Sequence, residues 1–258
     1  MAQKKKVKTT VVSQTIIAEN VYDLLLETDL AMDVRPGQFV GVYPNNASTL
    51  LPRPISICEA DKERKRLRLV YRVTGKGTRE FASYHSGDTL EVIGVLGNGF
   101  PLEKADGKSV LIIGGGIGIP PMLQLTKELK SDKIIVLGYR DENVCLQEEF
   151  SHYGKVYIAT EDGSVGSKGN VMDAIWENDL SADIIMACGP LPMLRAIKQY
   201  AAKNNIEAYI SLEERMACGV GACLGCVCKT KEVDHHSHVN NARICTDGPV
   251  FEAKEVDI

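Results

Sequence analysis

Val110-Leu-Ile-Ile-Gly-Gly-Gly-Ile-Gly-Ile-Pro-Pro121 joins a short apolar run, a glycine-rich turn and two prolines in direct succession. Apolar residues bounded by glycines predict a buried strand. A proline suits the first turn of a helix, where its missing N–H costs no hydrogen bond. The turn therefore leads from a strand into a helix N-terminus, whose free N–H groups can meet a pyrophosphate. The candidate nucleotide-binding residues of this turn are Gly114, Gly115, Gly116 and Gly118.

A second turn, Cys188-Gly-Pro190, also ends an apolar run and opens a helical stretch. Two strand ends of this kind at one crevice of an open sheet favour a ligand site, with Cys188, Gly189 and Pro190 at its edge. Cys188 either flanks a nicotinamide or is a small buried thiol. The dinucleotide fingerprint asks for a further glycine where this chain has Ile119, so the first turn is also compatible with a tight connection that binds nothing.

From Gly107 to about residue 212, buried β-type runs alternate with helical stretches. This alternation is typical of a parallel sheet with helices on its faces, and it predicts an α/β domain over residues 105–212. The β-type runs are 110–113, 133–137, 155–159, 183–187 and 208–212, and the helical spacing falls in 122–130 and 191–203.

Glu161 and Asp162 follow one of these runs, at the edge where a bound ribose would lie. Carboxylates there accept hydrogen bonds from ribose hydroxyls and repel a 2′-phosphate, which favours NAD over NADP. Arg140, after the preceding run, favours the opposite choice. NAD is therefore expected as the co-substrate.

Residues 1–104 have a different rhythm, with short β-type runs separated by turn signals. This pattern predicts an antiparallel β-barrel. The runs are 7–17, 22–26, 38–43, 66–73 and 89–93, and the basic stretch 62–68 is expected to be a hairpin turn.

Two short stretches of the predicted barrel carry groups that suit a flavin nucleotide. Arg53, at the end of a loop that leads into a β-type run, can fork onto a pyrophosphate, and Ser56 can hydrogen-bond a flavin nitrogen. Gly77 admits phosphate oxygens to the backbone, and Thr78 can cap a short helix that begins at Arg79. Each of these residues is equally typical of a solvated loop or turn.

Near the C-terminus, Cys218, Cys223, Cys226 and Cys245 follow the C-x₄-C-x₂-C…C spacing of a four-cysteine [2Fe–2S] site. Glycines between the first three let the backbone wrap closely and aim N–H groups at the sulfurs. These four residues are the predicted metal ligands, in a small module over residues 213–258, and they indicate an electron carrier.

Other assignments of this segment stay open. A structural zinc site also takes four thiolates, although zinc ribbons usually present two C-x₂-C pairs and Cys245 stands alone after a long polar loop. Cys228 could compete with Cys226 as a ligand, but the spacing favours Cys226. His235, His236 and His238 are interpreted as a solvated loop, because a Rieske centre takes two cysteines and two histidines and a full set of cysteines is present.

Bulk properties narrow the classes of function. The 258 residues are 44% hydrophobic and 25% charged with a net charge of -4, as in an ordinary soluble protein, and no footprint for nucleic acid or anionic lipid is evident. The most apolar stretch, 110–125, is broken by glycines and prolines and falls short of the roughly 20 apolar residues of a membrane span. Lys4 to Lys8 are not followed by an apolar segment of a secretory signal, so a reducing cytoplasm is expected.

Taken in order along the chain, these motifs resemble the electron-transfer subunits of class 1B dihydroorotate dehydrogenases, within the ferredoxin-reductase-like superfamily. The resemblance covers essentially the whole chain. The motifs are Arg53-Pro-Ile-Ser56, Tyr71-Arg-Val with Gly77-Thr78, Leu96-Gly-Asn-Gly-Phe100, the glycine turn from Gly114, Cys188-Gly-Pro190 and the terminal cysteines.

The resemblance implies an FAD-binding barrel, an NAD-binding domain and a [2Fe–2S] module. Its broader superfamily usually has a tyrosine where Ile55 stands, which leaves the flavin contact at that position open. The implied FAD contacts are Arg53, Pro54, Ile55, Ser56, Val70, Tyr71, Arg72, Gly77 and Thr78.

A nicotinamide takes electrons in pairs and an iron–sulfur cluster takes them singly, and a flavin accepts both. We therefore expect electrons to pass from cluster to FAD to NAD⁺. By resemblance, they come from a separate FMN-containing catalytic subunit that oxidises dihydroorotate to orotate in pyrimidine biosynthesis, in a heterotetramer with two of each subunit. The alternatives are the small subunit of an NADH-dependent ferredoxin:NADP⁺ oxidoreductase and a colourless regulatory module with a structural zinc ion.

Overall fold

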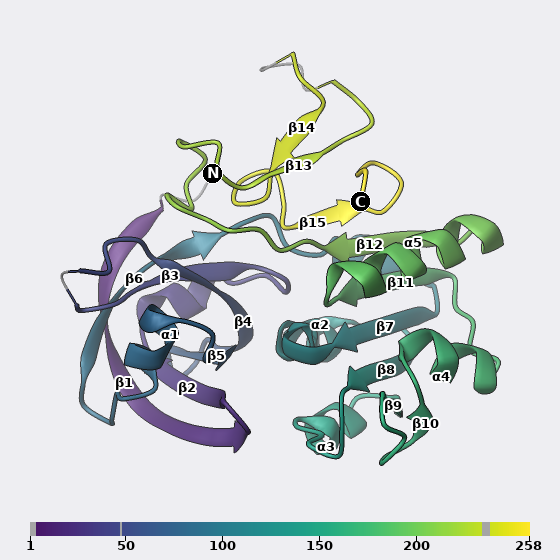
Figure 1. Ribbon diagram of the computed structural model, residues 1–258, viewed down its shortest axis with the longest axis horizontal. Coiled ribbons are helices and arrows are strands. Elements are labelled where there is room, and N and C mark those ends of the chain that lie inside the picture. The colour runs from purple at the N-terminus through teal and green to yellow at the C-terminus, as the bar shows by residue number, and fades with distance from the viewer. Residues whose placement is uncertain (1–3, 47, 234–237) are drawn as a thin grey trace.

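The computed structural model describes residues 4–46, 48–233 and 238–258 (Figure 1). The predicted antiparallel barrel is confirmed, and it closes with six strands in the order β1-β2-β5-β4-β3-β6, where the sequence indicates five runs. The strands are β1 (Lys5–Ala18), β2 (Val21–Glu27), β3 (Phe39–Tyr43), β4 (Arg53–Asp61), β5 (Arg66–Arg72) and β6 (Thr89–Leu96).

Inward-facing residues of all six strands fill the barrel, among them Leu24, Leu69 and Val92. The short helix α1 (Lys76–Phe81) closes one part of it, and its Phe81 ring meets Tyr71 edge-on at 5.9 Å between centroids. Residues 62–65 form the turn between β4 and β5, and the remainder of the predicted 62–68 turn belongs to β5. Two short 3₁₀ helices, Asp29–Asp33 and Leu102–Ala105, lie in the connections.

The second part is a seven-stranded sheet in the order β10-β9-β8-β7-β11-β12-β15. All neighbours pair in parallel except β12 and β15, so the predicted parallel sheet is confirmed, with one antiparallel edge added. The strands are β7 (Val110–Gly115), β8 (Lys133–Tyr139), β9 (Lys155–Thr160), β10 (Ser167–Lys168), β11 (Ile184–Cys188), β12 (Glu207–Ser211) and β15 (Val250–Glu252).

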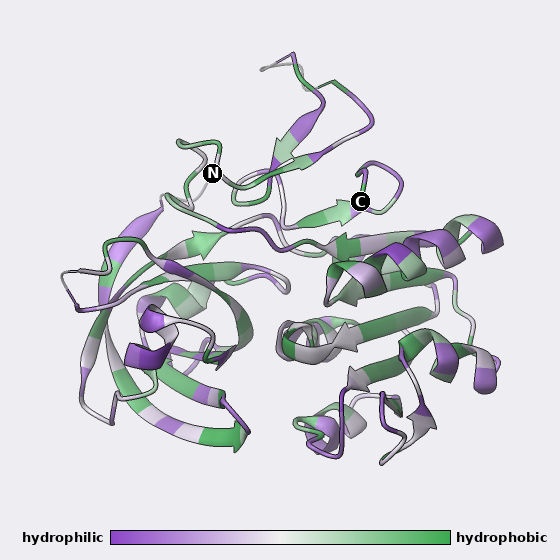
Figure 2. Ribbon diagram, in the orientation of Figure 1, coloured by the Kyte–Doolittle hydropathy of each residue, from purple (hydrophilic) through white to green (hydrophobic). Residues whose placement is uncertain are grey.

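Helices cover both faces of this sheet. This explains why the sequence of strand β7 is apolar without interruption. Val110 and Ile112 pack toward one core with helices α2 and α3, while Leu111 and Ile113 pack toward the other core with α4 and α5. A strand buried on both faces has no solvent side for polar residues (Figure 2). The helices are α2 (Pro120–Glu128), α3 (Gln147–Ser151), α4 (Val171–Glu177) and α5 (Leu191–Asn204).

The C-terminal segment lies against both other parts of the molecule (Figure 1). It contains a small antiparallel pair, β13 (Val227–Lys229) and β14 (Asn241–Arg243), and it also supplies β15 to the edge of the sheet. One hydrophobic core joins Leu96 of the barrel, residues of the sheet, and Cys226 and Cys245 of this segment. The cysteine-bearing segment is therefore fixed to the rest of the chain through a shared core.

The longest helix of the described residues, α5, has 14 residues, and none of the described helices combines the length and apolarity needed to cross a bilayer.

Candidate functional site

A cleft of about 810 Å³ lies between the barrel and the carboxyl edge of the sheet. Strands β7 and β11 are neighbours with Gly114 opposite Cys188, so both predicted turns leave the sheet at one place. The chain continues from β7 to β8 on one side and from β11 to β12 on the other, which makes this the switch point where open sheets bind ligands. Of the residues predicted to bind the nucleotide, those lining the cleft are Gly115, Gly116, Gly118, Gly189 and Pro190.

Contacts between the two turns explain the glycines. A Cβ on Gly118 would lie 2.5 Å from the carbonyl oxygen of Cys188, so only glycine lets the turns touch. Gly116 has a φ of +53°, in the left-handed region, and a Cβ there would meet nothing within 4 Å. Gly118 is thus required for packing and Gly116 for backbone conformation.

The helix after the first turn begins at Pro120, as the prolines predict, and a single 3₁₀ turn over Gly116–Gly118 precedes it. Ile119, which stands in place of the fingerprint's further glycine, is fully buried in the core beneath α2. This turn departs from the fingerprint because the Ile119 side chain is used for packing.

Gly114 and Cys188 do not line the cleft. The Cys188 side chain is 2% exposed, and burial raises its pKa to about 12 despite a hydrogen bond with Ser211. Of the two interpretations of Cys188, the buried thiol agrees with this placement.

Charged groups of both signs reach the cleft. Glu161 and Arg140 line it, as their positions after β9 and β8 predict. Asp162 does not line it. Its carboxylate accepts hydrogen bonds from Ser164, which hold its pKa below the usual range. Glu213 also lines the cleft, and desolvation by the cleft walls raises its pKa.

Sequence reasoning missed Glu213, although it is the first charged residue after the apolar run that forms β12. The barrel side of the cleft was missed as well, because Asn20, Val21 and Val73 join it only through the fold. Arg72, assigned to FAD by resemblance, lines this cleft.

In the barrel, β4 and β5 diverge. They pair from Ile57–Leu69 to Asp61–Arg66, but no ladder pair among the described residues joins 53–56 to 70–72. Residues 53–56 pair only with β3, and residues 70–72 only with β2. Two strand edges with free backbone N–H and C=O groups therefore face each other, and they suit a flat, polar-edged ring such as that of a flavin.

The prediction that Arg53–Ser56 ends a loop before a strand is wrong, because β4 begins at Arg53. The misleading signal is Pro54, which an edge segment tolerates because the missing N–H has no partner to lose. All four residues, Arg53, Pro54, Ile55 and Ser56, are half-buried.

Arg53 lies beside the first turn of α1. A Cβ on Gly77 would be 2.6 Å from Arg53 Nε, so this glycine leaves room for the guanidinium. Arg53 Nη1 donates to the carbonyl of Leu51 at 2.5 Å, and no ion pair of Arg53 occurs among the described residues. A guanidinium held beside a glycine turn is a suitable partner for a phosphate.

Helix α1 begins at Lys76, three residues before the predicted start at Arg79. Thr78 therefore lies inside the first turn, where its hydroxyl oxygen accepts from the N–H groups of Thr74 and Gly75 at 2.9 and 3.1 Å. It stabilises the start of the helix by reaching back, and it is not the cap residue itself.

Val70 and Tyr71, assigned to FAD by resemblance, are 3% and 2% exposed. The Tyr71 ring stacks on Tyr22, and its hydroxyl donates to Gln14 Oε1 at 2.9 Å. Their side chains support the barrel, so only the backbone of these two residues is available to a ligand.

The four predicted cluster ligands occupy two environments. Cys226 and Cys245 are buried at 2% and 1% exposure, Cys223 is exposed and Cys218 is half-buried. Burial acts to raise the pKa of Cys218, but hydrogen bonds from Val220 N–H at 3.5 Å and Cys223 N–H at 3.4 Å, together with the Cys223 side chain, lower it to about 6. Left-handed backbone at Gly219 and Gly221 shapes this loop, as expected.

The Cys223 side chain is close enough to affect the pKa of Cys218, and both Cys226 and Cys218 are close enough to affect that of Cys245. Burial, with help from Cys226, raises the pKa of Cys245 to about 12. Within 4–46, 48–233 and 238–258, no three His, Cys, Asp or Glu side chains converge as on a single metal ion.

Cys228 is half-buried on β13, and burial raises its pKa to about 11. His238 is exposed, and His235 and His236 lie outside the described residues.

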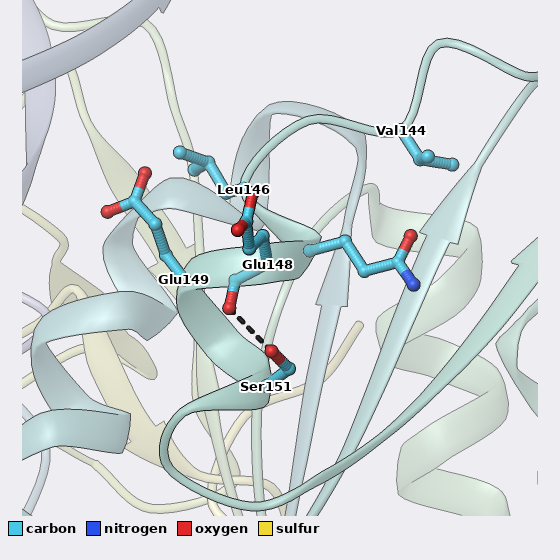
Figure 3. A pocket seen from close by; sticks show the side chains of 6 residues that line it. Val144, Leu146, Glu148, Glu149 and Ser151 are labelled. Carbon is cyan, nitrogen blue, oxygen red and sulfur yellow. Dashed lines mark hydrogen bonds between the residues drawn. The ribbon is translucent and has the colours of Figure 1, made fainter.

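A second depression, of about 480 Å³, lies at helix α3 (Figure 3). Leu146 and Glu148 line it, and Ser151 donates to the Glu148 carbonyl at 2.6 Å. Glu149, also at its rim, is held by Arg68 of the barrel. The Ser151 hydroxyl and the Glu149 carboxylate are used within the chain, and neither glycine turn lies here, so the larger cleft is the better candidate.

The contact between the two turns leads to a first prediction. Gly118→Ala should destabilise the chain by about 1–3 kcal/mol, because the new Cβ must displace the Cys188–Gly189 peptide. We expect the displaced peptide to cost about 1.4 kcal/mol of NADH binding free energy, which weakens binding roughly tenfold. Titration of the purified protein with NADH measures this. Gly75→Ala is the matched control, since a Cβ there meets nothing within 4 Å. Equal NADH affinity in both variants would contradict the prediction.

Comparisons with known proteins agree along the whole chain. The iron–sulfur cluster binding domain of dihydroorotate dehydrogenase B matches residues 213–257, and the oxidoreductase NAD-binding domain matches residues 112–199. The NADH-dependent reduced ferredoxin-NADP oxidoreductase structure superposes with a TM-score of 0.87 at 28% identity, covering 100% of this chain and 91% of the other. A ferredoxin NADP⁺ reductase from Neisseria gonorrhoeae, solved with FAD and NADP, shares the fold at a TM-score of 0.66 and 15% identity, over 83% and 95% of the two chains.

Sequence relatives are more similar still. The dihydroorotate dehydrogenase B (NAD(+)) electron transfer subunit of Geobacillus sp. (strain WCH70) is 44% identical over 259 residues, and that of Bacillus caldolyticus is 45% identical over 254. The matches cover 98% and 96% of both chains. With this identity over almost its full length, the chain belongs to the family of dihydroorotate dehydrogenase B (NAD(+)) electron transfer subunits.

Proposed function

We propose that this chain carries electrons from a dihydroorotate-oxidising partner to NAD⁺, through a [2Fe–2S] cluster and FAD. The observation that carries the proposal is that one chain holds four cysteines at [2Fe–2S] spacing, a pair of diverging barrel strands and a switch-point cleft, and that a shared core joins the cysteine segment to the barrel and the sheet. When bound, the flavin supplies the exchange between single electrons and hydride.

At the cleft, the turn over Gly115–Gly118 and the turn at Gly189 offer backbone N–H groups to the pyrophosphate of NAD. Glu161 is the proposed acceptor for the ribose hydroxyls, which supports NAD over NADP, although Arg140 shares the cleft. Cys188 supports this site from beneath, through the carbonyl that packs on Gly118.

In the barrel, the free edges of residues 53–56 and 70–72 are proposed to bind the polar rim of the flavin ring, with the Ser56 hydroxyl as a further hydrogen-bonding group. Arg53 and the backbone around Gly77 are placed to hold phosphate. Thr78 keeps that turn in shape.

Cys218, Cys223, Cys226 and Cys245 are the proposed ligands of the cluster. Cys223 is exposed and its neighbour Leu224 is 64% exposed, so this edge of the cluster would reach the surface where a partner can dock. The three proposed units are residues 1–104 for FAD, 105–212 for NAD and 213–258 for the cluster.

A family of electron transfer subunits implies a catalytic partner. We propose that the partner carries FMN, that two copies of each subunit assemble, and that the complex works in the cytoplasm, where the eight cysteines stay reduced. Dihydroorotate loses two electrons and two protons to give orotate, and NAD⁺ takes up the electrons and one proton as hydride while the other proton is released.

The test is to co-express the chain with its catalytic partner, purify the complex anaerobically and measure dihydroorotate-dependent reduction of NAD⁺. We expect equal amounts of orotate and NADH, flavin and iron–sulfur absorption bands, and a paramagnetic signal on reduction. Activity with reduced ferredoxin and NADP⁺ instead would favour the rival oxidoreductase, whose structure this chain superposes on. A colourless protein with zinc would overturn both assignments.

A further inference from the structure

The barrel loop after β6 grips the segment that follows Cys245. The Asn98 side-chain amide donates to the carbonyls of Asp247 at 3.0 Å and Val250 at 2.7 Å, and Val250 N–H donates to Asn98 Oδ1 at 3.1 Å. The backbone N–H of Asn98 also donates to the carbonyl of Gly248 at 2.8 Å. One residue of the barrel thus holds three residues of the C-terminal segment.

Packing around Asn98 adds to these hydrogen bonds. Gly97 has a φ of +82°, and a Cβ on it would lie 2.5 Å from Pro249 Cδ, so the two segments are in direct contact. Gln38 of the barrel fixes the loop from behind by donating to the Gly97 carbonyl at 2.7 Å. A Cβ on Gly219, next to Cys218, would lie 3.4 Å from Leu96.

The segment that Asn98 binds, residues 247–250, follows a proposed cluster ligand directly. Cys245 lies in a tight turn in which the N–H groups of Thr246 and Asp247 donate to the Arg243 carbonyl at 3.1 and 2.8 Å. The Asp247 carboxylate pairs with Arg243 at 3.1 Å, which closes the same turn through side chains. A displacement of Asp247 is therefore transmitted to Cys245, two residues away.

We propose that Asn98 is a positioning residue that sets the placement of the cluster relative to the flavin. It sits on the barrel proposed to hold FAD and holds the turn proposed to hold one iron, so the distance between the two cofactors depends on its hydrogen bonds. The inference rests on the proposed ligand set and FAD site. Electron transfer between two fixed cofactors slows steeply with distance. A more mobile turn should therefore slow electron transfer from FAD to the cluster before it lowers the stability of the chain.

An asparagine is required here because the site needs a donor and an acceptor on one short side chain. Asn98→Asp keeps the size and the acceptor but places a carboxylate oxygen against the carbonyls of Asp247 and Val250. Asn98→Ala removes all three side-chain hydrogen bonds. Asn98 is exposed at the surface, so neither variant creates a cavity or threatens folding.

The experiment mixes each purified, cofactor-loaded variant anaerobically with NADH and follows the bleaching of FAD and the subsequent reduction of the cluster by stopped-flow absorbance. We expect FAD to bleach at the wild-type rate and the cluster to be reduced roughly tenfold more slowly or worse in both Asn98 variants. The matched control is Asn178→Ala, which removes a side-chain hydrogen bond to the Ala174 carbonyl at 3.0 Å at the end of α4 and should match the wild type. The EPR spectrum of the reduced cluster is the second readout, and it should change only in the Asn98 variants.

Wild-type cluster reduction together with a wild-type EPR spectrum in both Asn98 variants would overturn the inference. Cys245→Ser separates this failure from failure of the proposed function. If Cys245→Ser keeps its full iron content and EPR signal, the ligand set is wrong; if it loses them while the Asn98 variants behave as wild type, only the role of Asn98 is wrong.

Discussion

Cys223→Ser is expected to lose its iron and, in the assembled complex, at least roughly a hundredfold of dihydroorotate-dependent NAD⁺ reduction. The proposed cluster takes a thiolate from each of the four cysteines, and a serine hydroxyl does not ionise near neutral pH. Cys223 is exposed, so its replacement leaves the shared core intact and the effect reports on the metal alone. Iron analysis and the EPR spectrum of the reduced protein measure the loss.

Cys228→Ser is the matched control for this prediction. It lies two residues after Cys226 on strand β13, and the C-x₄-C-x₂-C spacing assigns the ligand role to Cys226. It should keep its iron. NADH-driven reduction of a soluble dye through FAD should persist in both variants, which shows that the flavin and nucleotide sites are intact. Loss of iron in Cys228→Ser together with its retention in Cys226→Ser would transfer the ligand role to Cys228.

Much of this architecture could be predicted because its signals are local. The run of residues 110–113 is apolar at every position because both of its faces are covered, and the prolines that follow mark the start of α2. The β10 and β15 strands could not be predicted in the same way. They have two and three residues, and β15 belongs to the sheet only because the chain returns to β12 after the cysteines.

The site was predictable where one residue type performs one task, as in the glycines of the first turn. The site was less predictable where function depends on backbone groups that two strands leave without a ladder partner. The divergence of β4 and β5 after Ile57 and Leu69 has no local sequence signal, since it follows from the closure of the barrel. Asn98 belongs to the motif Leu96-Gly-Asn-Gly-Phe100, but its partners lie some 150 positions away and only the fold brings them together.

An ion cluster between the barrel and the α/β part is the basis of the last prediction. Arg68 on β5 is 17% exposed, and its guanidinium binds Asp23 of β2 at 2.7 Å and both carboxylate oxygens of Glu149 on α3, at 2.6 and 2.9 Å. Glu59 lies 3.4 Å from the same group and also pairs with Lys127 of α2 at 2.5 Å. The cluster thus ties three barrel strands, β2, β4 and β5, to two helices of the NAD-binding part.

Arg68→Met should destabilise the chain by about 3 kcal/mol, because the remaining carboxylates are left close together with a single lysine to balance them. The hydrogen bond from Arg68 is the main reason that the pKa of Glu149 lies below its ordinary value of 4.5. A lowered pKa adds stability above that ordinary value, and this stability is lost as the pH falls through the folded-state value. The stability gap between wild type and variant should therefore be largest near neutral pH and narrow below about pH 4.5.

Urea unfolding of the two proteins across this pH range is the measurement, and Arg64→Met is the matched control. Arg64 pairs with Asp61 at 3.7 Å, but its side chain is 73% exposed, so its loss should cost less than about 1 kcal/mol at any pH. The cluster joins the barrel to α2 and α3, on the side of the sheet that carries the proposed NAD cleft, so Arg68→Met should slow FAD reduction by saturating NADH, while Arg64→Met should not. If both variants lose the same stability with the same dependence on pH, the cluster contributes no more than an exposed ion pair, and the orientation of the two parts must come from the packing of α2 on β4.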